Sequence, residues 1–146
     1  MGSGKSFAGK YLSTQMAIPH FDLDHELVNI TDSSISSIFS VKGERYFRKL
    51  ESELLLADKF CGIISTGGGI VESQRNRDFL RSQFCIWLSP QWQSIYNRIK
   101  NSDRPLVKNK TELELKAIYQ SRKPLYKACA DIVYRETNLD ELTKMI

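Results

Sequence analysis

The stretch Gly2-Ser3-Gly4-Lys5-Ser6 leads directly into residues 5–17, whose apolar side chains recur near the helical period. Glycines followed by a lysine and a hydroxyl residue at the start of a helix are typical of a phosphate-binding loop, or P-loop. Backbone N–H groups can approach a phosphate there, and the helix N-terminus adds a partial positive charge. Lys5 can then contact the outer phosphates, and the Ser6 hydroxyl can bind Mg²⁺. The alternative is a flexible N-terminal tail, but Gly9 and the immediate amphipathic helix argue against it.

The rest of the chain alternates between predicted strands and helices. Further helices are expected at 35–39, ended by Gly43, and at 44–58, 91–100, 112–128 and after Asn138. Strands are expected at 20–22, 62–66, 84–88 and 132–134, of which 84–88 is the clearest buried one. Strands separated by helices predict a parallel sheet covered on both faces. No repeat or linker interrupts residues 1–146, so a single α/β domain is expected.

Composition narrows the classes of partner. The 21 Lys and Arg residues against 17 Asp and Glu give a net charge of +4, which suits an anionic small molecule and a nucleic acid equally. No basic block or RNA-binding signature is present, so nucleic acid is not expected. No apolar run approaches the ~20 residues of a membrane span, and no signal peptide is recognisable. Cys61, Cys85 and Cys129 lack zinc-site spacing, so we expect buried free thiols in a cytoplasmic protein.

Two carboxylates follow the first predicted strand, in Phe21-Asp22-Leu23-Asp24. Alternate residues of a strand share a face, and two like charges side by side are costly unless a cation or a hydroxyl donor lies between them. One carboxylate could therefore contact Mg²⁺ and the other a substrate hydroxyl. The alternative is that Asp24 only caps a helix beginning near Glu26. The sequence leaves both interpretations open.

Two further groups of residues suggest a ligand site. Arg48 and Glu51 lie three residues apart on one helical face, with Glu44 one turn earlier, although most such groups are solvated surface pairs. Thr66-Gly67-Gly68-Gly69 follows a predicted strand. Three glycines favour a loop that a ligand approaches closely, since a tight turn needs only one or two.

Taken in order, these motifs resemble the shikimate kinase family over nearly the whole chain. The motifs are Gly2 to Ser6; Phe21-Asp22-Leu23-Asp24; Ile35, Ile38 and Phe39 with Gly43-Glu44 and Phe47-Arg48-x-x-Glu51; Ser65 to Val71; Arg104-Pro105-Leu106; and Arg122-x-Pro124-Leu125-Tyr126 with Ala130-Asp131. Any one motif could arise by chance, whereas the complete ordered set is specific.

The resemblance implies a P-loop NTPase fold, a three-layer sandwich around a parallel five-stranded sheet with strand order 2-3-1-4-5. Members of the family have an apolar first strand that runs into the first P-loop glycine, and here both are missing or truncated at Met1. We expect this to leave unpaired backbone groups between the strands at 62–66 and 84–88, at a cost comparable with the net stability of a domain.

The resemblance also implies a reaction, namely transfer of the ATP γ-phosphoryl group to the 3-hydroxyl of shikimate on the route to chorismate and the aromatic amino acids. ATP and shikimate are the expected partners, Mg²⁺ the expected cofactor, and a monomer the expected state. One alternative is a gluconate kinase-like enzyme, against which the paired Arg48 and Arg122 argue. The other is a catalytically weakened kinase-like binding protein, suggested by the missing strand.

Site residues follow from the resemblance position by position. Residues 101–111 would form a lid, and about 22–58 the shikimate-binding region. His20 and His25 match no catalytic position. The implied sites are catalytic Lys5, Asp24 and Arg104; ATP-binding Gly2, Ser3, Gly4, Lys5, Ser6, Phe7, Arg98 and Arg104; substrate-binding Asp24, Arg48, Glu51, Gly67, Gly68, Gly69 and Arg122; and metal-binding Ser6 and Asp22.

Overall fold

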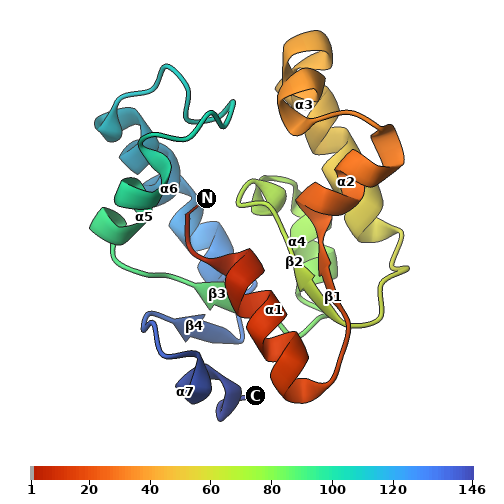
Figure 1. Ribbon diagram of the computed structural model, residues 1–146, viewed down its shortest axis with the longest axis vertical. Helices are drawn as coiled ribbons and strands as arrows, with labels where there is room; N and C mark the ends of the chain where they lie inside the picture. Colours follow the sequence, from red (N-terminus) through yellow and green to blue (C-terminus); the bar gives the residue numbers. More distant parts are fainter. Residues whose placement is uncertain (1) are drawn as a thin grey trace. The chain divides into compact units, whose positions relative to one another are not determined.

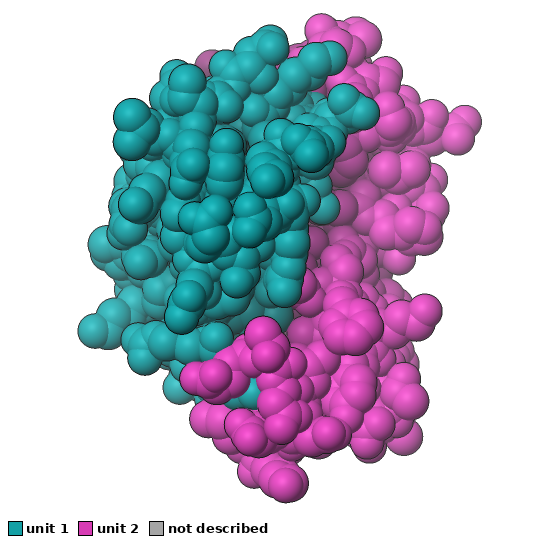
Figure 2. All heavy atoms as spheres, turned by 60° about the vertical axis from the view of Figure 1, so that its left-hand side comes forward, with its two compact units in different colours: residues 1–3, 71–135 teal, residues 4–70, 136–146 magenta. Residues whose placement is uncertain are grey.

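A computed structural model describes residues 2–146 of the protein, and the chain divides into two compact units. Unit 1 is formed by residues 2–3 and 71–135, and unit 2 by residues 4–70 and 136–146 (Figure 2). Each unit contains one small parallel sheet together with the helices that belong to it (Figure 1). The α/β class expected from the sequence is therefore observed in both units.

Unit 2 pairs two three-residue strands, and the helices around them follow the expected alternation. β1 and β2 are parallel, with His20 opposite Ile63 and Asp22 opposite Ser65. The core of the unit includes Leu23 and Leu27, which are almost fully buried. Its elements are α1 (Lys5–Met16), β1 (His20–Asp22), α2 (Leu23–Thr31), α3 (Ile35–Leu56), β2 (Ile63–Ser65) and α7 (Leu139–Thr143).

Unit 1 pairs β3 with β4, again in parallel. Ile95, Ile99, Val107 and Leu115 form its hydrophobic cluster, against which three aromatic rings pack. A short 3₁₀ turn, η1 (Ile70–Glu72), spans the boundary between the units. The other elements are α4 (Gln74–Leu80), β3 (Ile86–Leu88), α5 (Trp92–Ile99), α6 (Glu112–Lys127) and β4 (Ile132–Tyr134).

The sheets are smaller than the sequence predicted. Residues 2–146 show two two-stranded sheets, and not one five-stranded sheet. The strand expected at 84–88 begins only at Ile86, because the Cys85 N–H donates to the Asp131 carboxylate at 2.8 Å. Phe84, expected in a buried strand, is 61% exposed. The parallel pairing and the strands at 20–22 and 132–134 were predicted correctly, whereas the strands at 62–66 and 84–88 are shorter than expected.

Helix boundaries depend on local capping. α2 was not predicted as a full helix. Its N-cap is Asp22, whose carboxylate accepts from the Asp24 N–H, so the alternative in which Asp24 only caps a helix is wrong. The break expected at Gly43 is present, because this glycine has φ of 78° inside α3. α6 passes through Pro124 and begins with a capping box between Thr111 and Glu114.

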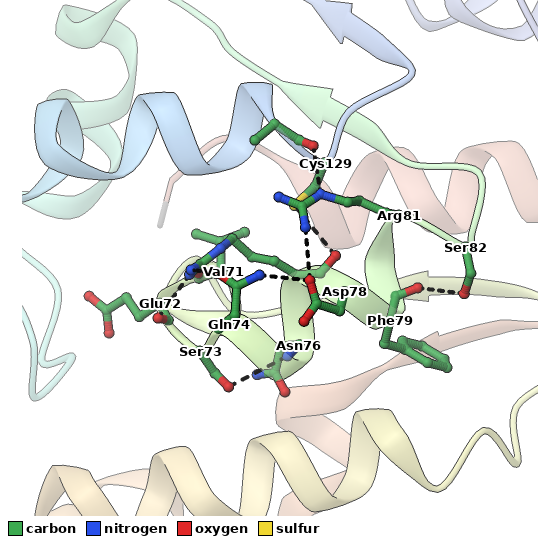
Figure 3. Close-up of polar contacts among 12 residues, drawn as sticks. Val71, Glu72, Ser73, Gln74, Asn76, Asp78, Phe79, Arg81, Ser82 and Cys129 are labelled. Atoms are coloured by element: carbon green, nitrogen blue, oxygen red, sulfur yellow. Dashed lines mark hydrogen bonds and ion pairs between the residues drawn. The ribbon is translucent and has the colours of Figure 1, made fainter.

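Helix α4 was also missed by the sequence reading, because its seven residues are mostly polar. Its first turn is capped by the Ser73 hydroxyl, which accepts from the Asn76 N–H (Figure 3). On the exposed side, the Asp78 carboxylate accepts from both Gln74 and Arg81. These local contacts define a helix that has only two buried residues.

The three cysteines are free thiols in different surroundings. Cys129 is buried and Cys85 half-buried, whereas Cys61 is exposed, so the expectation of three buried thiols was wrong for Cys61. Burial raises the pKa of Cys85 to about 11. No helix among residues 2–146 is both long enough and apolar enough to cross a membrane.

Candidate active site

The start of α1 brings the P-loop lysine to the two carboxylates. Gly4 is the N-cap of this helix, with φ of 92°, a conformation that glycine adopts without strain. The Lys5 Nζ atom lies 3.6 Å from an oxygen of Asp22 and 3.6 Å from an oxygen of Asp24. The Ser6 hydroxyl donates to Oδ2 of Asp22, the same oxygen that Lys5 contacts. Lys5 is therefore the cation that lies between the two like charges of Asp22 and Asp24.

Asp22 is held in its ionised form. Its burial alone would raise the pKa of the carboxyl group. The Ser6 hydroxyl, the Lys5 ammonium and the Asp24 N–H together outweigh that cost, so the pKa is lowered. An anionic oxygen therefore lies at the N-terminus of α1, next to a serine hydroxyl.

The glycine-rich loop continues this group within unit 2. A Cβ atom on Gly67 would overlap Glu51 Oε1 and lie 3.6 Å from an oxygen of Asp24. A Cβ atom on Gly69 would overlap the Arg48 guanidinium group. The loop therefore needs glycine at these positions because charged side chains pack directly against its backbone.

Arg48 is held by a buried carboxylate. Its Nη1 atom lies 2.6 Å from Oε2 of Glu51, which is only 1% exposed, and its Nη2 atom lies 3.3 Å from Glu44 on the outer side. The arginine side chain itself remains 18% exposed. The interpretation of this group as a solvated surface pair is wrong for Glu51 and correct only for Glu44.

Unit 1 contains a second arginine pair. Arg122 lies on α6 with its side chain 8% exposed, and its Nε and Nη2 atoms lie 2.9 and 2.8 Å from Oε1 of Glu72. Glu72 is 45% exposed, and its side chain points away from α4 (Figure 3). Beside it, burial raises the pKa of Tyr126, and the neighbouring Arg122 charge and hydrogen bond partly offset that rise.

The expected adenine-side and lid residues also belong to unit 1. The Arg98 guanidinium donates to the Gly2 carbonyl at 3.0 Å. Arg104 is exposed, and its carbonyl accepts from the N–H groups of Val107 and Lys108. Val107 is buried in the hydrophobic cluster of the unit, so the loop at 101–111 is attached at that residue.

The two units thus divide the predicted site residues between them. In unit 2, contacts connect Lys5, Ser6, Asp22, Asp24, Arg48, Glu51, Gly67 and Gly69, and the same unit contains Gly4, Phe7 and Gly68. Unit 1 contains Gly2, Ser3, Arg98, Arg104 and Arg122. Most of the predicted acid, base and phosphate-binding groups therefore lie in one compact unit.

Three polar residues beside the site were given no role from the sequence alone. His20 Nε2 lies 2.9 Å from the Ser65 hydroxyl, which in turn lies 3.1 Å from the Lys5 carbonyl. Glu72 is the partner of Arg122 described above. For two of them the sequence offered one signal, namely their position: Ser65 lies shortly before the glycine-rich loop and Glu72 shortly after it. His20 begins β1, in the strand expected at 20–22, and His25 is exposed on α2.

Comparison with known proteins identifies the family. A family model for shikimate kinase matches residues 1–145. A shikimate kinase from Dictyoglomus turgidum is 39% identical, over 98% of this chain and 88% of its own length. The one from Aquifex aeolicus is 36% identical, over 100% of this chain and 89% of its own.

Solved structures agree with this assignment. The shikimate kinase from Acinetobacter baumannii in complex with shikimate has a TM-score of 0.90 at 28% identity, covering 99% of this chain and 85% of that one. The crystal structure of the Aquifex aeolicus enzyme has a TM-score of 0.81 at 35% identity, covering 99% and 87%. Since the family model, the relatives and the folds agree over nearly its whole length, the chain belongs to the shikimate kinase family of enzymes.

Proposed function

We propose that this enzyme transfers the γ-phosphoryl group of ATP to the 3-hydroxyl of shikimate, with unit 2 supplying most of the reacting groups. The observation that carries the proposal is the position of Lys5 at the N-terminus of α1, 3.6 Å from both Asp22 and Asp24. Phosphoryl transfer needs mainly positioning and neutralisation of charge, and this group offers both.

Lys5 and Asp24 are the proposed catalytic groups of unit 2. Lys5 would leave its carboxylate partners to contact the β- and γ-phosphates, since its flexible side chain is 23% exposed. Asp24, 37% exposed, would then accept a hydrogen bond from the attacking hydroxyl and orient it or take its proton. Backbone N–H groups of Gly4, Ser6 and Phe7 at the helix N-terminus would bind phosphate oxygens.

The residues present fit a magnesium ion. The Ser6 hydroxyl and the Asp22 carboxylate are in contact, and both are oxygen ligands of the kind that Mg²⁺ prefers. The lowered pKa of Asp22 keeps that carboxylate ionised. These two residues would hold the metal together with phosphate oxygens of ATP. When bound, Mg²⁺ would neutralise charge on the phosphates.

Shikimate would be bound through its carboxylate by Arg48 and Arg122, because a planar guanidinium can form two parallel hydrogen bonds to a carboxylate. Glu51 would keep Arg48 in position, which its 2.6 Å contact and near-complete burial support. The backbone of Gly67 to Gly69 would offer N–H groups to the substrate. The Acinetobacter baumannii relative in complex with shikimate supports this choice of substrate. Residues 22–58 would form most of the shikimate-binding region.

Unit 1 would supply further groups that bind ATP. Residues 101–111 would act as a lid that brings the exposed Arg104 to the transferring phosphoryl group. Arg98, exposed on α5, would stack on the adenine ring, and Gly2 and Ser3 would complete the P-loop. Arg104→Ala should therefore lower kcat more than it raises the KM for shikimate.

The strand order, the oligomeric state and the cellular compartment are also part of the proposal. The observed pairings, β1 with β2 and β3 with β4, are the two pairings that flank strand 1 in a five-stranded order 2-3-1-4-5. We propose that order for the complete sheet, within a single domain. A cytoplasmic monomer is proposed as well, with the three free thiols in support of a reducing compartment. Size-exclusion chromatography with light scattering tests the monomer.

The test measures ADP formation by purified protein with ATP, Mg²⁺ and shikimate, and with gluconate as an alternative acceptor. We expect turnover with shikimate only, and a loss of about 100-fold or more in kcat for Lys5→Met and for Asp24→Asn. Lys10→Met, an exposed lysine on the same helix, is the matched control and should keep full activity. A folded protein that binds shikimate in calorimetry without forming ADP would be a binding protein and would contradict the proposal.

A further inference from the structure

Two of the missed residues form a hydrogen-bonded chain beneath the start of α1. His20 opens β1, Ser65 closes β2, and Lys5 is the first residue of the helix. The distances along this chain are 2.9 Å from His20 Nε2 to the Ser65 hydroxyl and 3.1 Å from that hydroxyl to the Lys5 carbonyl oxygen. Ser65 is 5% exposed, so its hydroxyl depends on these protein partners.

The direction of the chain follows from its chemistry. A carbonyl oxygen can only accept, so the single hydroxyl proton of Ser65 is donated to Lys5. The same hydroxyl oxygen must then accept from His20, which requires a proton on Nε2. His20 is therefore fixed as a donor by a residue 45 positions away. Each group in the chain has one defined role.

The neighbouring glycine leaves the space that this chain occupies. A Cβ atom on Gly9 would lie 2.7 Å from His20 Cδ2 and 2.7 Å from the Ser65 hydroxyl. Helical geometry pairs the Gly9 N–H with the Lys5 carbonyl, so Ser65 adds a second donor to an oxygen already used by the helix. Any larger residue at position 9 would separate the strand ends from the first turn of α1.

The same sheet face also carries Asp22. Alternate residues of a strand share a face, so His20 and Asp22 lie on one side of β1, and Ser65 lies directly opposite Asp22. Asp22 contacts the side chains of Lys5 and Ser6, whereas Ser65 contacts the backbone of Lys5. The first turn of α1 is thus held at two points, one through side chains and one through the backbone.

We propose that His20 and Ser65 are positioning residues for the P-loop, which orient Lys5 and Ser6 toward the phosphates and the metal by fixing the Lys5 carbonyl. This inference rests on the proposed function, because it takes Lys5 and Ser6 to be the phosphate- and metal-binding groups. It assigns a role to a histidine and a serine for which the sequence reading had none.

Nucleotide affinity provides the first test, because it requires no turnover. In calorimetry with Mg²⁺ and ADP, Ser65→Ala and His20→Phe should each weaken binding about fivefold, as expected for the loss of one hydrogen bond. The double variant should be no weaker than either single variant, since both break one chain. Ser65→Thr keeps the hydroxyl and should retain most of the affinity. His25→Phe, which changes the exposed histidine of α2, is the matched control.

Steady-state kinetics provide the second test. The KM for ATP should rise about fivefold in Ser65→Ala, and the KM for shikimate should change less than twofold. Equal changes in both constants would indicate general damage and overturn the proposal. If His20→Phe fails to fold because its ring meets Gly9, His20→Ala replaces it, with thermal unfolding measured for every variant.

Nuclear magnetic resonance tests the chain directly. A protected proton on Nε2 of His20 should be observed in the wild type and lost in Ser65→Ala. The carbon-bound ring protons of His25 should keep their chemical shifts in both proteins. A folded wild type without that proton would overturn the inference, as would unchanged ADP affinity in both single variants. Wild-type protein that binds ADP but never phosphorylates shikimate would contradict the proposed function. The ADP calorimetry and the nuclear magnetic resonance measurement would still test the positioning role, because neither needs turnover.

Discussion

The protein contains two arginine–glutamate pairs with opposite burial. In the pair of unit 2, the carboxylate of Glu51 is 1% exposed and the Arg48 side chain 18% exposed. In the pair of unit 1, the Arg122 side chain is 8% exposed and the Glu72 carboxylate 45% exposed. The N–O distances, 2.6 and 2.8 Å, are similar. The same chemical pair therefore occurs once with a buried anion and once with a buried cation.

The difference in burial indicates which carboxylate matters for folding and which mainly orients its arginine. A buried charge without its partner is costly, whereas a half-exposed charge is solvated by water. Glu51 lies on the same helix face as Arg48, three residues away, and cannot reach water, so it holds the arginine in place. Glu72 comes from a different element than Arg122 and keeps contact with solvent. We therefore expect Glu51 to matter for folding and Glu72 mainly for the orientation of Arg122.

The largest effect is expected for Glu51→Ala. This change leaves the guanidinium group of Arg48 without its buried anion, and the free energy of unfolding should fall by about 3 kcal/mol. Urea denaturation followed by circular dichroism measures it. Glu53→Ala on the exposed side of the same helix is the control and should change stability little. A loss below about 1 kcal/mol for Glu51→Ala would remove the distinction between the two pairs.

The next largest effect is expected for replacement of the arginines themselves. In Arg122→Lys and in Arg48→Lys, the KM for shikimate should rise at least about tenfold, because lysine cannot form the paired hydrogen bonds to a carboxylate. The KM for ATP should change less than about twofold, and initial-rate kinetics separate the two. Arg45→Lys, an exposed arginine of α3, should behave as the wild type. Equal effects on both substrates would contradict the carboxylate assignment.

A smaller effect is expected for Glu72→Gln. The amide keeps the shape of the side chain and removes its charge, so Arg122 should lose part of its orientation and the KM for shikimate should rise about threefold. The free energy of unfolding should fall by only about 1 to 2 kcal/mol, because the buried Arg122 loses its anion but the amide oxygen of Gln can still accept its hydrogen bonds. A decrease in KM would instead mean that Glu72 competes with the substrate carboxylate for Arg122.

The smallest effect is expected for Glu44→Gln. Glu44 is 48% exposed and lies 3.3 Å from Arg48 on the outer side of α3. An exposed pair of this kind contributes about 0.5 kcal/mol or less, so the free energy of unfolding should change by no more than that and the KM for shikimate by less than about twofold. A change as large as that of Glu51→Ala would show that burial does not decide the role of the partner.

The sequence predicted elements and motifs well where a local rule applies. Gly4 before Lys5 predicts the start of a helix, and Gly43 predicts the break in α3, because backbone conformation at a glycine is a local property. Prediction from the sequence failed where specific hydrogen-bond partners determine the ends of an element. β3 is short because the Asp131 carboxylate accepts from the Cys85 N–H, 46 residues away in the chain. α2 begins at Leu23 for a different reason, a local one: the carboxylate of Asp22 caps the helix by accepting from the Asp24 N–H. Neither contact is encoded by periodicity.

For the site, the sequence by itself predicted which residues carry the chemistry, because the P-loop, the acidic pair and the glycine-rich loop are short motifs whose spacing suits phosphate and carboxylate binding. Only the tertiary structure decided their partners. It placed Lys5 between Asp22 and Asp24, buried Glu51 behind Arg48, and connected His20 to the Lys5 carbonyl through Ser65. Burial and hydrogen-bond partners arise from contacts between residues distant in the chain, which no local pattern can specify.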